Sequence, residues 1–498
     1  MFIKALIALL ILALPSCNKP RQKDVLIIAD ADKIDKESVD DPAALQNSVI
    51  GDLVFNTLSY VDNDLIPHNL LIEEVRPLPG GKTIEIKIRK GIRFHDGMEM
   101  TESDVAASIS RIIERDEYLK ERYGQLKVAI VDKLKIRVTG DNPLADIDTV
   151  LLPNLYISLK GLGGTGPYSL AYWLYNGVEL EANEDYFEGR PKIKKIRYLY
   201  EEDERKRVNM LLKGEADLLV WLSPEMAGFL KPDSRFYVKE ITNYSYSALF
   251  LNNESPLFRD KALRRAVSMA IDRDKLIKKV LKGSGTKASG PLPSYTFQQE
   301  NDTASQNYRP REAFRLLKDA GWRDADGDGI LEKNGKKLRF RLYYNSNVEE
   351  FKKMADLISQ DLFEIGIGVE AIPADMGEST DRNFKPGNYD AILNGKSSYD
   401  SVNLLTWGSS SLSNLSRFSN REMDTLLERL KEATNIEQKK EIYNKMQRIF
   451  EEEVPAVFLY NPVIYTAASK RFKGAEDFVG SAYSMYKIKD WSVNEDYE

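Results

Sequence analysis

The segment 91–111 constrains the fold more than any other part of the sequence, because it commits the chain to a strand end, a tight turn and a helix. Gly91 and Gly97 bracket two aromatic side chains, and the Asp-Gly pair that ends at Gly97 is typical of turns. A helix is expected next, since Thr101 or Ser103 can cap free backbone N–H groups. One helix face is apolar and consists of Val105, Ile109, Ile112 and Ile113. The residues by themselves therefore predict a β-turn-α corner.

The first residues have the pattern of an export signal. A single early charge at Lys4 precedes the apolar run 5–14, which is too short to span a bilayer. Cys17, the one cysteine of the chain, follows directly and is succeeded by a polar segment. This arrangement resembles a bacterial lipoprotein signal. We therefore expect residues 1–17 to form the signal peptide and 18–24 a tether, with acylation of Cys17 holding the protein on a membrane.

The composition excludes several classes of function. Without Cys17 the mature chain has no cysteine, which removes disulfides, thiol catalysis and cysteine metal sites. The two histidines, His68 and His95, are not in an H-x-x-x-H pattern, and the sequence has no Walker loop and no G-x-S-x-G. The balance of 71 basic against 77 acidic residues argues against a nucleic-acid-binding face. We expect neither an enzyme nor a cofactor, because no nucleophile–base set can be assembled.

Hydrophobic patterns predict an α/β chain, and its length of 498 residues suggests more than one lobe. Residues 25–29 are apolar throughout, which suits a strand buried on both faces. Residues 83–89 alternate between apolar and polar and indicate a half-buried strand with a wet outer face. Strand patterns at 338–344 and 367–372 flank a helical pattern, and such a βαβ unit argues for a parallel sheet.

An ordered set of motifs resembles a known family. R-x-G-x-x-F-H-D-G runs into T-x-x-D-V-x-x-S-x-x-R, G-T-G-P-Y follows at 164–168, and a long string ending in A-I-D-R occupies 250–273. The residues that match the first two motifs are Arg89, Gly91, Phe94, His95, Asp96, Gly97, Thr101, Asp104, Val105, Ser108 and Arg111. Together these strings resemble the extracytoplasmic solute-binding proteins that include oligopeptide- and dipeptide-binding proteins. The resemblance covers essentially the whole mature chain.

This resemblance implies an α/β fold of the periplasmic-binding-protein type, class II. Two lobes would surround a hinge, and an extra α+β domain would be inserted in the first lobe. The first lobe is expected to combine 25–45, 164–248 and 461–498, with the inserted domain at 46–163 and the second lobe at 249–460. The chain would then cross between the lobes twice, which suits closure around a ligand.

The resemblance also implies a function. Family members capture a solute in the cleft between the lobes and deliver it to an ABC permease in the inner membrane. We expect an extracytoplasmic, lipid-anchored monomer that binds a peptide and no nucleic acid. Two alternatives stay open: a receptor for a non-peptide solute, and a signalling lipoprotein that uses the fold without transport.

The residues of the ligand site are inferred partly from their alignment with peptide-binding relatives. Peptide-binding relatives carry an aspartate, just before a Y-x-[DE]-P segment, that pairs with the ammonium group of the peptide. Ser397 stands at that aspartate, and Asn394 replaces the usual tryptophan. Either Asp400 takes over the ammonium group, or the ligand is not an ordinary free-amine peptide. The residues expected to line the cleft are Asp30, Asp32, Ser397, Tyr399, Asp400 and Tyr460.

An aspartate-rich loop follows in the second lobe. Asp324, Asp326 and Asp328 stand at positions one, three and five of a sequence that resembles a calcium loop. Position twelve is Gly335, however, where such a loop needs a bidentate glutamate. We expect a polar turn with at most weak calcium affinity, and no metal site.

Overall fold

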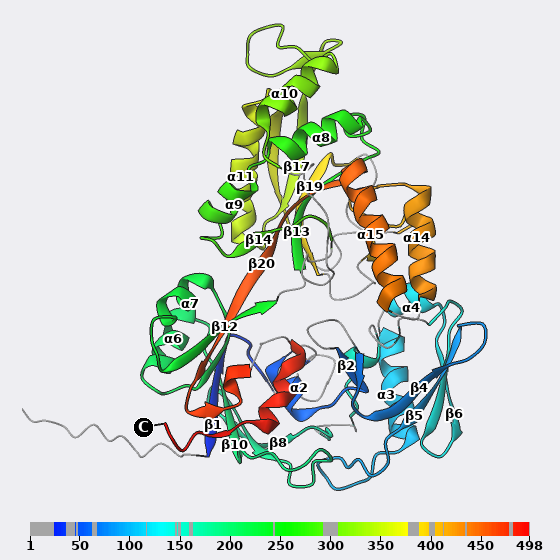
Figure 1. The fold of residues 1–498 in the computed structure, drawn as a ribbon, viewed down its shortest axis with the longest axis vertical. Helices are drawn as coiled ribbons and strands as arrows, with labels where there is room; N and C mark the ends of the chain where they lie inside the picture. The colour runs from blue at the N-terminus through cyan, green and yellow to red at the C-terminus, as the bar shows by residue number, and fades with distance from the viewer. Residues whose placement is uncertain are drawn as a thin grey trace, which may run out of the picture.

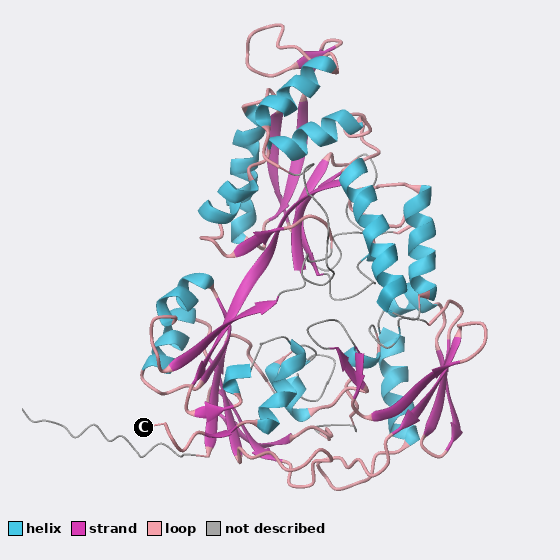
Figure 2. Cartoon of the chain, in the orientation of Figure 1, coloured by secondary structure: helices cyan, strands magenta, loops and turns pink. Residues whose placement is uncertain are grey.

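The computed structural model describes residues 24–35, 45, 48–61, 67–115, 117–144, 147, 151–158, 163–242, 245–291, 307–376, 388–397, 404–411, 413–433, 436–477 and 482–497. Figures 1 and 2 show an upper lobe and a wider lower part, joined by the long strand β20 (Ala456–Ser469). The lower part consists of a lower lobe around β1 (Val25–Asp30) and a side domain that contains β4 (Ile72–Pro77).

Strand β20 belongs to both lobes. Its first residues pair with β13 (Ser245–Leu251) in the upper lobe, where Tyr460 lies opposite Ser247. Its later residues pair with β12 (Phe236–Thr242) and β11 (Leu218–Leu222) in the lower lobe. β14 (Gly285–Lys287) pairs with β20 between these two halves. One continuous sheet therefore runs through both lobes, in the order β18-β17-β19-β13-β20-β11-β1-β10-β9-β8.

The lower lobe is built around β1, which is buried as its apolar sequence predicts. It lies parallel to β10 (Lys195–Tyr200) and to β11. One face of this sheet packs against α2 (Val49–Val54) and η5 (Ala482–Asp490), and the other against α6 (Glu204–Leu212) and α7 (Pro224–Leu230). β9 (Gly177–Ala182) and β8 (Tyr168–Leu174) extend the sheet with antiparallel pairing.

The predicted βαβ unit of the upper lobe is confirmed. It consists of β17 (Arg339–Asn345), α11 (Glu349–Phe363) and β18 (Gly368–Ala374), and the two strands pair in parallel. β19 (Ala391–Ser397) lies parallel to β17 on its other side. Helices cover both faces of this sheet: α8 (Lys261–Ala270), α9 (Arg273–Lys279), α10 (Pro310–Asp319), α14 (Arg421–Glu432) and α15 (Ile436–Glu453).

The side domain has a four-stranded antiparallel sheet in the order β4-β5-β7-β6. Its elements are β4, β5 (Thr83–Ile88), α3 (Glu102–Arg115), α4 (Glu117–Tyr123), β6 (Lys127–Asp132) and β7 (Lys135–Thr139). The alternating sequence of β5 predicted a wet outer face, yet Glu85 is buried on it. The reason is pairing, because the Glu85 carboxylate lies 2.6 Å from Arg76 and 2.7 Å from Arg137 on the two neighbouring strands.

Short elements complete the described chain. They are β2 (Ser59–Val61), β3 (Pro67–Asn69), η2 (Leu152–Asn154), β15 (Glu332–Lys333), β16 (Lys336–Lys337), β21 (Phe472–Lys473), η4 (Ala475–Asp477) and β22 (Ser492–Val493).

The two sequence landmarks contact each other at the junction between the side domain and the lower lobe. The backbone N–H of His95 donates to the Gly164 carbonyl, and its ring Nε2 lies 3.0 Å from the Gly166 carbonyl. A Cβ at Gly164 would lie 2.0 Å from the Val54 carbonyl oxygen, so only glycine fits against α2. The glycines therefore serve close packing between chain segments.

The described chain enters the side domain after α2. Leu45 and α2 pack in the core of the lower lobe, whereas the core of the side domain begins at Leu58. The domain limits stated from the sequence stay a prediction. Among the described residues, no helix is long and apolar enough to cross a membrane. Cys17 and residues 18–23 of the tether lie outside the described residues.

A buried ion pair ties together the strands at the base of the lower lobe, and we predict that breaking it destabilises the protein strongly. Asp217 is fully buried and accepts hydrogen bonds from the Ile27 backbone N–H (3.0 Å) and from Arg471 (3.0 and 3.1 Å). Arg471 also donates to the Val25 carbonyl. Arg471→Ala leaves the carboxylate buried without its cation and should cost about 3–5 kcal/mol of the free energy of unfolding, measured by urea denaturation. Lys473→Ala, which removes an exposed pair on the same segment, should leave the midpoint nearly unchanged; equal effects of the two substitutions would contradict the prediction.

Candidate ligand-binding site

The predicted site residue Asp30 ends β1 and is buried, with 1% of its surface exposed. Its carboxylate accepts from the Ala31 backbone N–H (2.7 Å) and lies 3.1 Å from the Tyr198 hydroxyl. The same hydroxyl lies 2.7 Å from the carbonyl oxygen of Asp32, whose side chain is exposed. Tyr198 of β10 thus holds the turn after β1, and no sequence motif pointed to this partner.

The protonation of Asp30 is shifted by its surroundings. Burial, and to a smaller degree the neighbouring Asp32 carboxylate, raise the pKa of Asp30 to about 6. Burial also raises the pKa of the Tyr198 phenol, which stays protonated and can donate. Asp30 therefore gains its charge within the pH range between mildly acidic and neutral.

The predicted residues Ser397 and Tyr460 belong to the upper lobe. Ser397 is the last residue of β19 and pairs with Ser245 of β13. Tyr460 lies one strand further, opposite Ser247 of β13, and burial raises its pKa to about 12. The sheet thus brings Ser397 and Tyr460 to the same end of the upper lobe. Tyr399 and Asp400 lie outside the described residues. The assignment of all six residues to a ligand stays a prediction.

The strand directions place Asp30 at the end of the lower lobe that faces Ser397 and Tyr460 of the upper lobe. β20 runs from the upper lobe into the lower lobe, and β11 is antiparallel to it. The carboxyl ends of β11 and of its parallel neighbours β1 and β10 therefore point toward the upper lobe. In open α/β sheets, ligands bind at the carboxyl ends of parallel strands.

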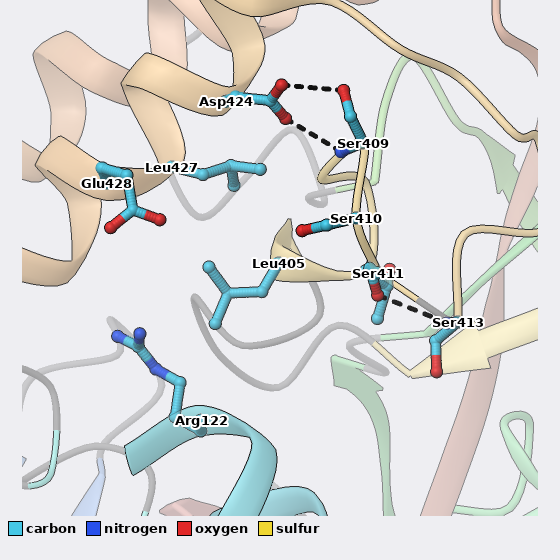
Figure 3. A pocket seen from close by; sticks show the side chains of 10 residues that line it. Arg122, Leu405, Ser409, Ser410, Ser411, Ser413, Asp424, Leu427 and Glu428 are labelled. Atoms are coloured by element: carbon cyan, nitrogen blue, oxygen red, sulfur yellow. Dashed lines mark hydrogen bonds between the residues drawn. The ribbon is translucent and has the colours of Figure 1, made fainter. Parts of the chain in front are cut away.

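A cavity of about 420 Å³ lies between the side domain and the upper lobe (Figure 3). The sequence analysis did not anticipate it. Its walls come from Arg122 at the end of α4, from the loop after β19 and from the first turns of α14. The lining residues are Arg122, Leu405, Thr406, Ser409, Ser410, Ser411, Ser413, Asp424, Leu427 and Glu428.

Two serines of the loop that lines the cavity, Ser409 and Ser413, are held by α14 and β19. Ser409 donates to Asp424 through its backbone N–H (2.8 Å) and its hydroxyl (2.7 Å), as Figure 3 shows. Lys396, the residue before Ser397, donates to the Ser413 carbonyl at 2.7 Å. The cavity therefore adjoins the end of β19, where the predicted ammonium-binding position lies. The serine run after Gly408 was the one sequence signal that could have indicated it.

The chemistry of the lining is mixed. Hydroxyl groups of four serines and a threonine stand beside the apolar side chains of Leu405 and Leu427. Arg122 is 4% exposed and supplies a cation, while Asp424 and Glu428 supply carboxylates. The cavity offers hydrogen-bonding groups, apolar surface and both signs of charge, in the size range of small-ligand sites.

The aspartate loop brings its three carboxylates within 4.8 Å of one another. Lys337 lies among them, 2.7 Å from Asp326 and in contact with Asp328, and these contacts raise its pKa. A cation from the chain itself thus offsets part of the negative charge of the cluster. Weak calcium affinity stays a prediction.

Comparison with known proteins identifies the family. The model of the bacterial extracellular solute-binding proteins, family 5 Middle, matches residues 67–413. The chain belongs to this family. Family 5 consists of solute-binding proteins, so the chain is the substrate-binding protein of an ABC transporter. Proteins of this family are not enzymes, and the expectation of a non-enzymatic function is confirmed.

Relatives of family 5 cover nearly the whole chain. The oligopeptide-binding protein AppA of Bacillus subtilis is 27% identical, over 96% of this chain and 93% of AppA. The glutathione-binding protein GsiB of Pectobacterium atrosepticum is 25% identical over 87% of each chain. Among solved structures, NikA of Brucella suis in complex with Fe(III)-EDTA superposes with a TM-score of 0.79 at 20% identity, covering 94% of this chain and 100% of NikA. AppA with a nonapeptide gives a TM-score of 0.69 at 24% identity, over 95% of this chain and 99% of AppA. These likenesses confirm the predicted fold class.

We predict that Asp30 makes stability depend on pH. Its pKa of about 6 in the folded protein lies above the value near 4 expected for the unfolded chain. The folded protein therefore binds more protons between about pH 4 and 6, and the contribution of Asp30 to stability decreases as pH rises through this window. The free energy of unfolding of wild type relative to Asp30→Asn should fall by about 1–3 kcal/mol from pH 4 to pH 7, measured by urea denaturation.

Asp32→Asn serves as the matched variant for this measurement. It keeps Asp30 and its burial but removes the neighbouring charge, the smaller cause of the raised pKa, so the fall in stability with pH should become smaller without disappearing. An Asp30→Asn profile parallel to that of wild type would contradict the prediction.

Proposed function

We propose that the protein captures peptides between its lobes and delivers them to an ABC permease. The observation that carries this proposal is the cavity beside β19. Serine and threonine hydroxyls can donate to peptide carbonyls and accept from peptide N–H groups without regard to sequence. Leu405 and Leu427 can contact apolar side chains, and the charged residues can pair with ionised groups of the peptide. The 27% identity with an oligopeptide-binding protein over almost the full chain supports the same ligand class.

The ammonium group of the peptide is proposed to meet a carboxylate near the end of β19. Ser397 cannot neutralise a cation, so we assign this role to Asp400. Leaving an ammonium group buried without a partner costs several kcal/mol. A carboxylate is therefore required if free-amine peptides are the ligand.

The peptide proposal predicts binding of a pool of synthetic oligopeptides by the delipidated protein. Calorimetry and native mass spectrometry should detect bound peptide, and Asp400→Asn should weaken binding about 30-fold or more. Ser397→Asp, which restores the acid at the position used by peptide-binding relatives, should recover affinity in the Asp400→Asn background. Two competing probes are glutathione, named for GsiB, and haem, named for the heme-binding protein A of Haemophilus influenzae, which is 25% identical over 79% of this chain. The peptide proposal is wrong if the wild-type protein binds no peptide. The role of Asp400 is wrong if the Asp400→Asn variant binds peptide as tightly as wild type.

We further propose that Cys17 carries a lipid anchor that keeps the protein near its permease. Several acyl chains on one residue bind a bilayer firmly, whereas one chain binds only marginally. Cys17→Ala should release the mature protein into the soluble fraction of cells or leave its signal uncleaved. Cys17 is the sole cysteine, so no other thiol can replace it. A variant that still partitions into detergent like wild type would exclude this anchor.

A further inference from the structure

Trp221 has the backbone conformation of a residue under a special constraint. Its φ is +58°, in the left-handed region that a tryptophan rarely adopts. Strained residues of this kind persist where the surrounding structure enforces them, and they concentrate at functional sites. Trp221 stands near the end of β11, the strand between β20 and β1.

The strain comes from an extra residue in β11. Leu219 pairs with Ala467 of β20, and the following pair joins Leu222 to Tyr465. Three steps along β11 therefore match two steps along β20, which is a β-bulge. Bulges redirect a side chain that would otherwise follow the alternation of the strand.

The bulge moves the indole ring to the opposite face of the sheet. Leu219 and Leu222 pack toward α6 and α7, whereas Val220 packs toward α2 and η5. In an unbroken strand Trp221 would share the face of Leu219. Instead it packs beside Val220 against the α2 face, where it remains partly exposed.

This position lies at the edge of the lower lobe that faces the upper lobe. Trp221 is at the level of Tyr465 and Thr466, about 16 Å along β20 from Tyr460. Ile34, which follows the turn after Asp30, packs against the same core cluster. Two residues after Leu222 the chain enters α7, and Glu225 of α7 pairs with Lys282 of the upper lobe. This end of β11 therefore reaches the space between the lobes.

We propose that Trp221 is a ligand-contacting residue of the lower lobe, on whose ring an apolar or aromatic side chain of the bound peptide stacks. This inference rests on the proposed peptide-binding function and adds a specificity determinant on the lobe opposite the cavity. A tryptophan ring offers a large apolar face, which makes it a frequent source of binding energy at interfaces. The bulge holds that face in place before the ligand arrives, so little conformational entropy is lost on binding.

The test uses fluorescence and affinity on the full mature protein. The chain has five tryptophans, of which Trp322, Trp407 and Trp491 are buried. Binding of an oligopeptide pool rich in phenylalanine and leucine should change the emission of wild type, and this change should disappear in Trp221→Phe. The matched control is Trp173. It is also partly buried, against the same core between the lower sheet and α2, but it lies on β8, four strands away from β11. Trp173→Phe should keep both the emission change and the affinity.

Trp221→Gly removes the ring in a variant that can still fold, because glycine adopts a φ of +58° without strain. It should bind the peptide pool about 10- to 30-fold more weakly than wild type, with Trp173→Phe within about twofold. An affinity of Trp221→Gly within twofold of wild type, or an unchanged emission signal in Trp221→Phe, overturns the role of Trp221.

Failure of the peptide proposal can be told apart from failure of this inference. Glutathione and haem are measured alongside the peptide pool on wild type and on Trp221→Gly. If one of them binds while peptides do not, the peptide proposal falls, and a loss of that probe's affinity in Trp221→Gly supports the role of the ring. If wild type binds peptides and Trp221→Gly binds them equally well, only the inference on Trp221 falls. If wild type binds none of the probes, both fall.

Discussion

The backbone pairing of β20 with strands of both lobes is the constraint on which the rest of the structure depends. Above the crossing, the buried Arg273 donates to the Phe458 carbonyl of β20 at 2.6 Å, and burial lowers its pKa to about 10. Below the crossing, the Asp217–Arg471 pair fixes the base of the lower sheet. Charged groups that are buried or nearly buried therefore lie near both ends of the strand. Relative motion of the lobes therefore has to change the backbone at this crossing of β20 and at the second connection between the lobes, from β12 to β13, since a hinge needs only a few residues that change their backbone angles.

This connection decides which strand ends of the two lobes face each other. Because β11 is antiparallel to β20, the carboxyl ends of the parallel strands in the lower lobe face the upper lobe. Asp30 and Trp221 lie at that edge, and Ser397 and Tyr460 lie at the facing end of the upper sheet. The side domain adds the Arg122 wall of the cavity. A solute held there, as we propose, would contact several parts of the protein, and only a higher affinity for a closed form would shift an equilibrium between open and closed lobes.

Local sequence rules are broken at a few positions, and each break has a tertiary cause. Glu85 is buried in an alternating strand because two arginines from neighbouring strands neutralise it. Trp221 adopts a left-handed backbone because the bulge in β11 requires it. Proteins tolerate such exceptions where packing or function compensates for them.

The sequence by itself determined the family, the α/β fold, the two-faced burial of β1 and the βαβ unit of the upper lobe. These follow from motifs in order and from hydrophobic periodicity, which are local properties of the chain. It also predicted three cleft residues: Asp30 because it follows the first strand, Ser397 because it aligns with the aspartate of peptide-binding relatives, and Tyr460 because it stands at the expected second crossing. It could not assign their contacts. Only the tertiary structure decided that Tyr198 holds Asp30, that His95 meets the Gly164–Gly166 carbonyls, and that Arg122 faces α14 across a cavity. Those partners are separated by long stretches of chain, and the pairing of distant segments depends on strand register and on which elements pack together, neither of which leaves a local pattern in the sequence.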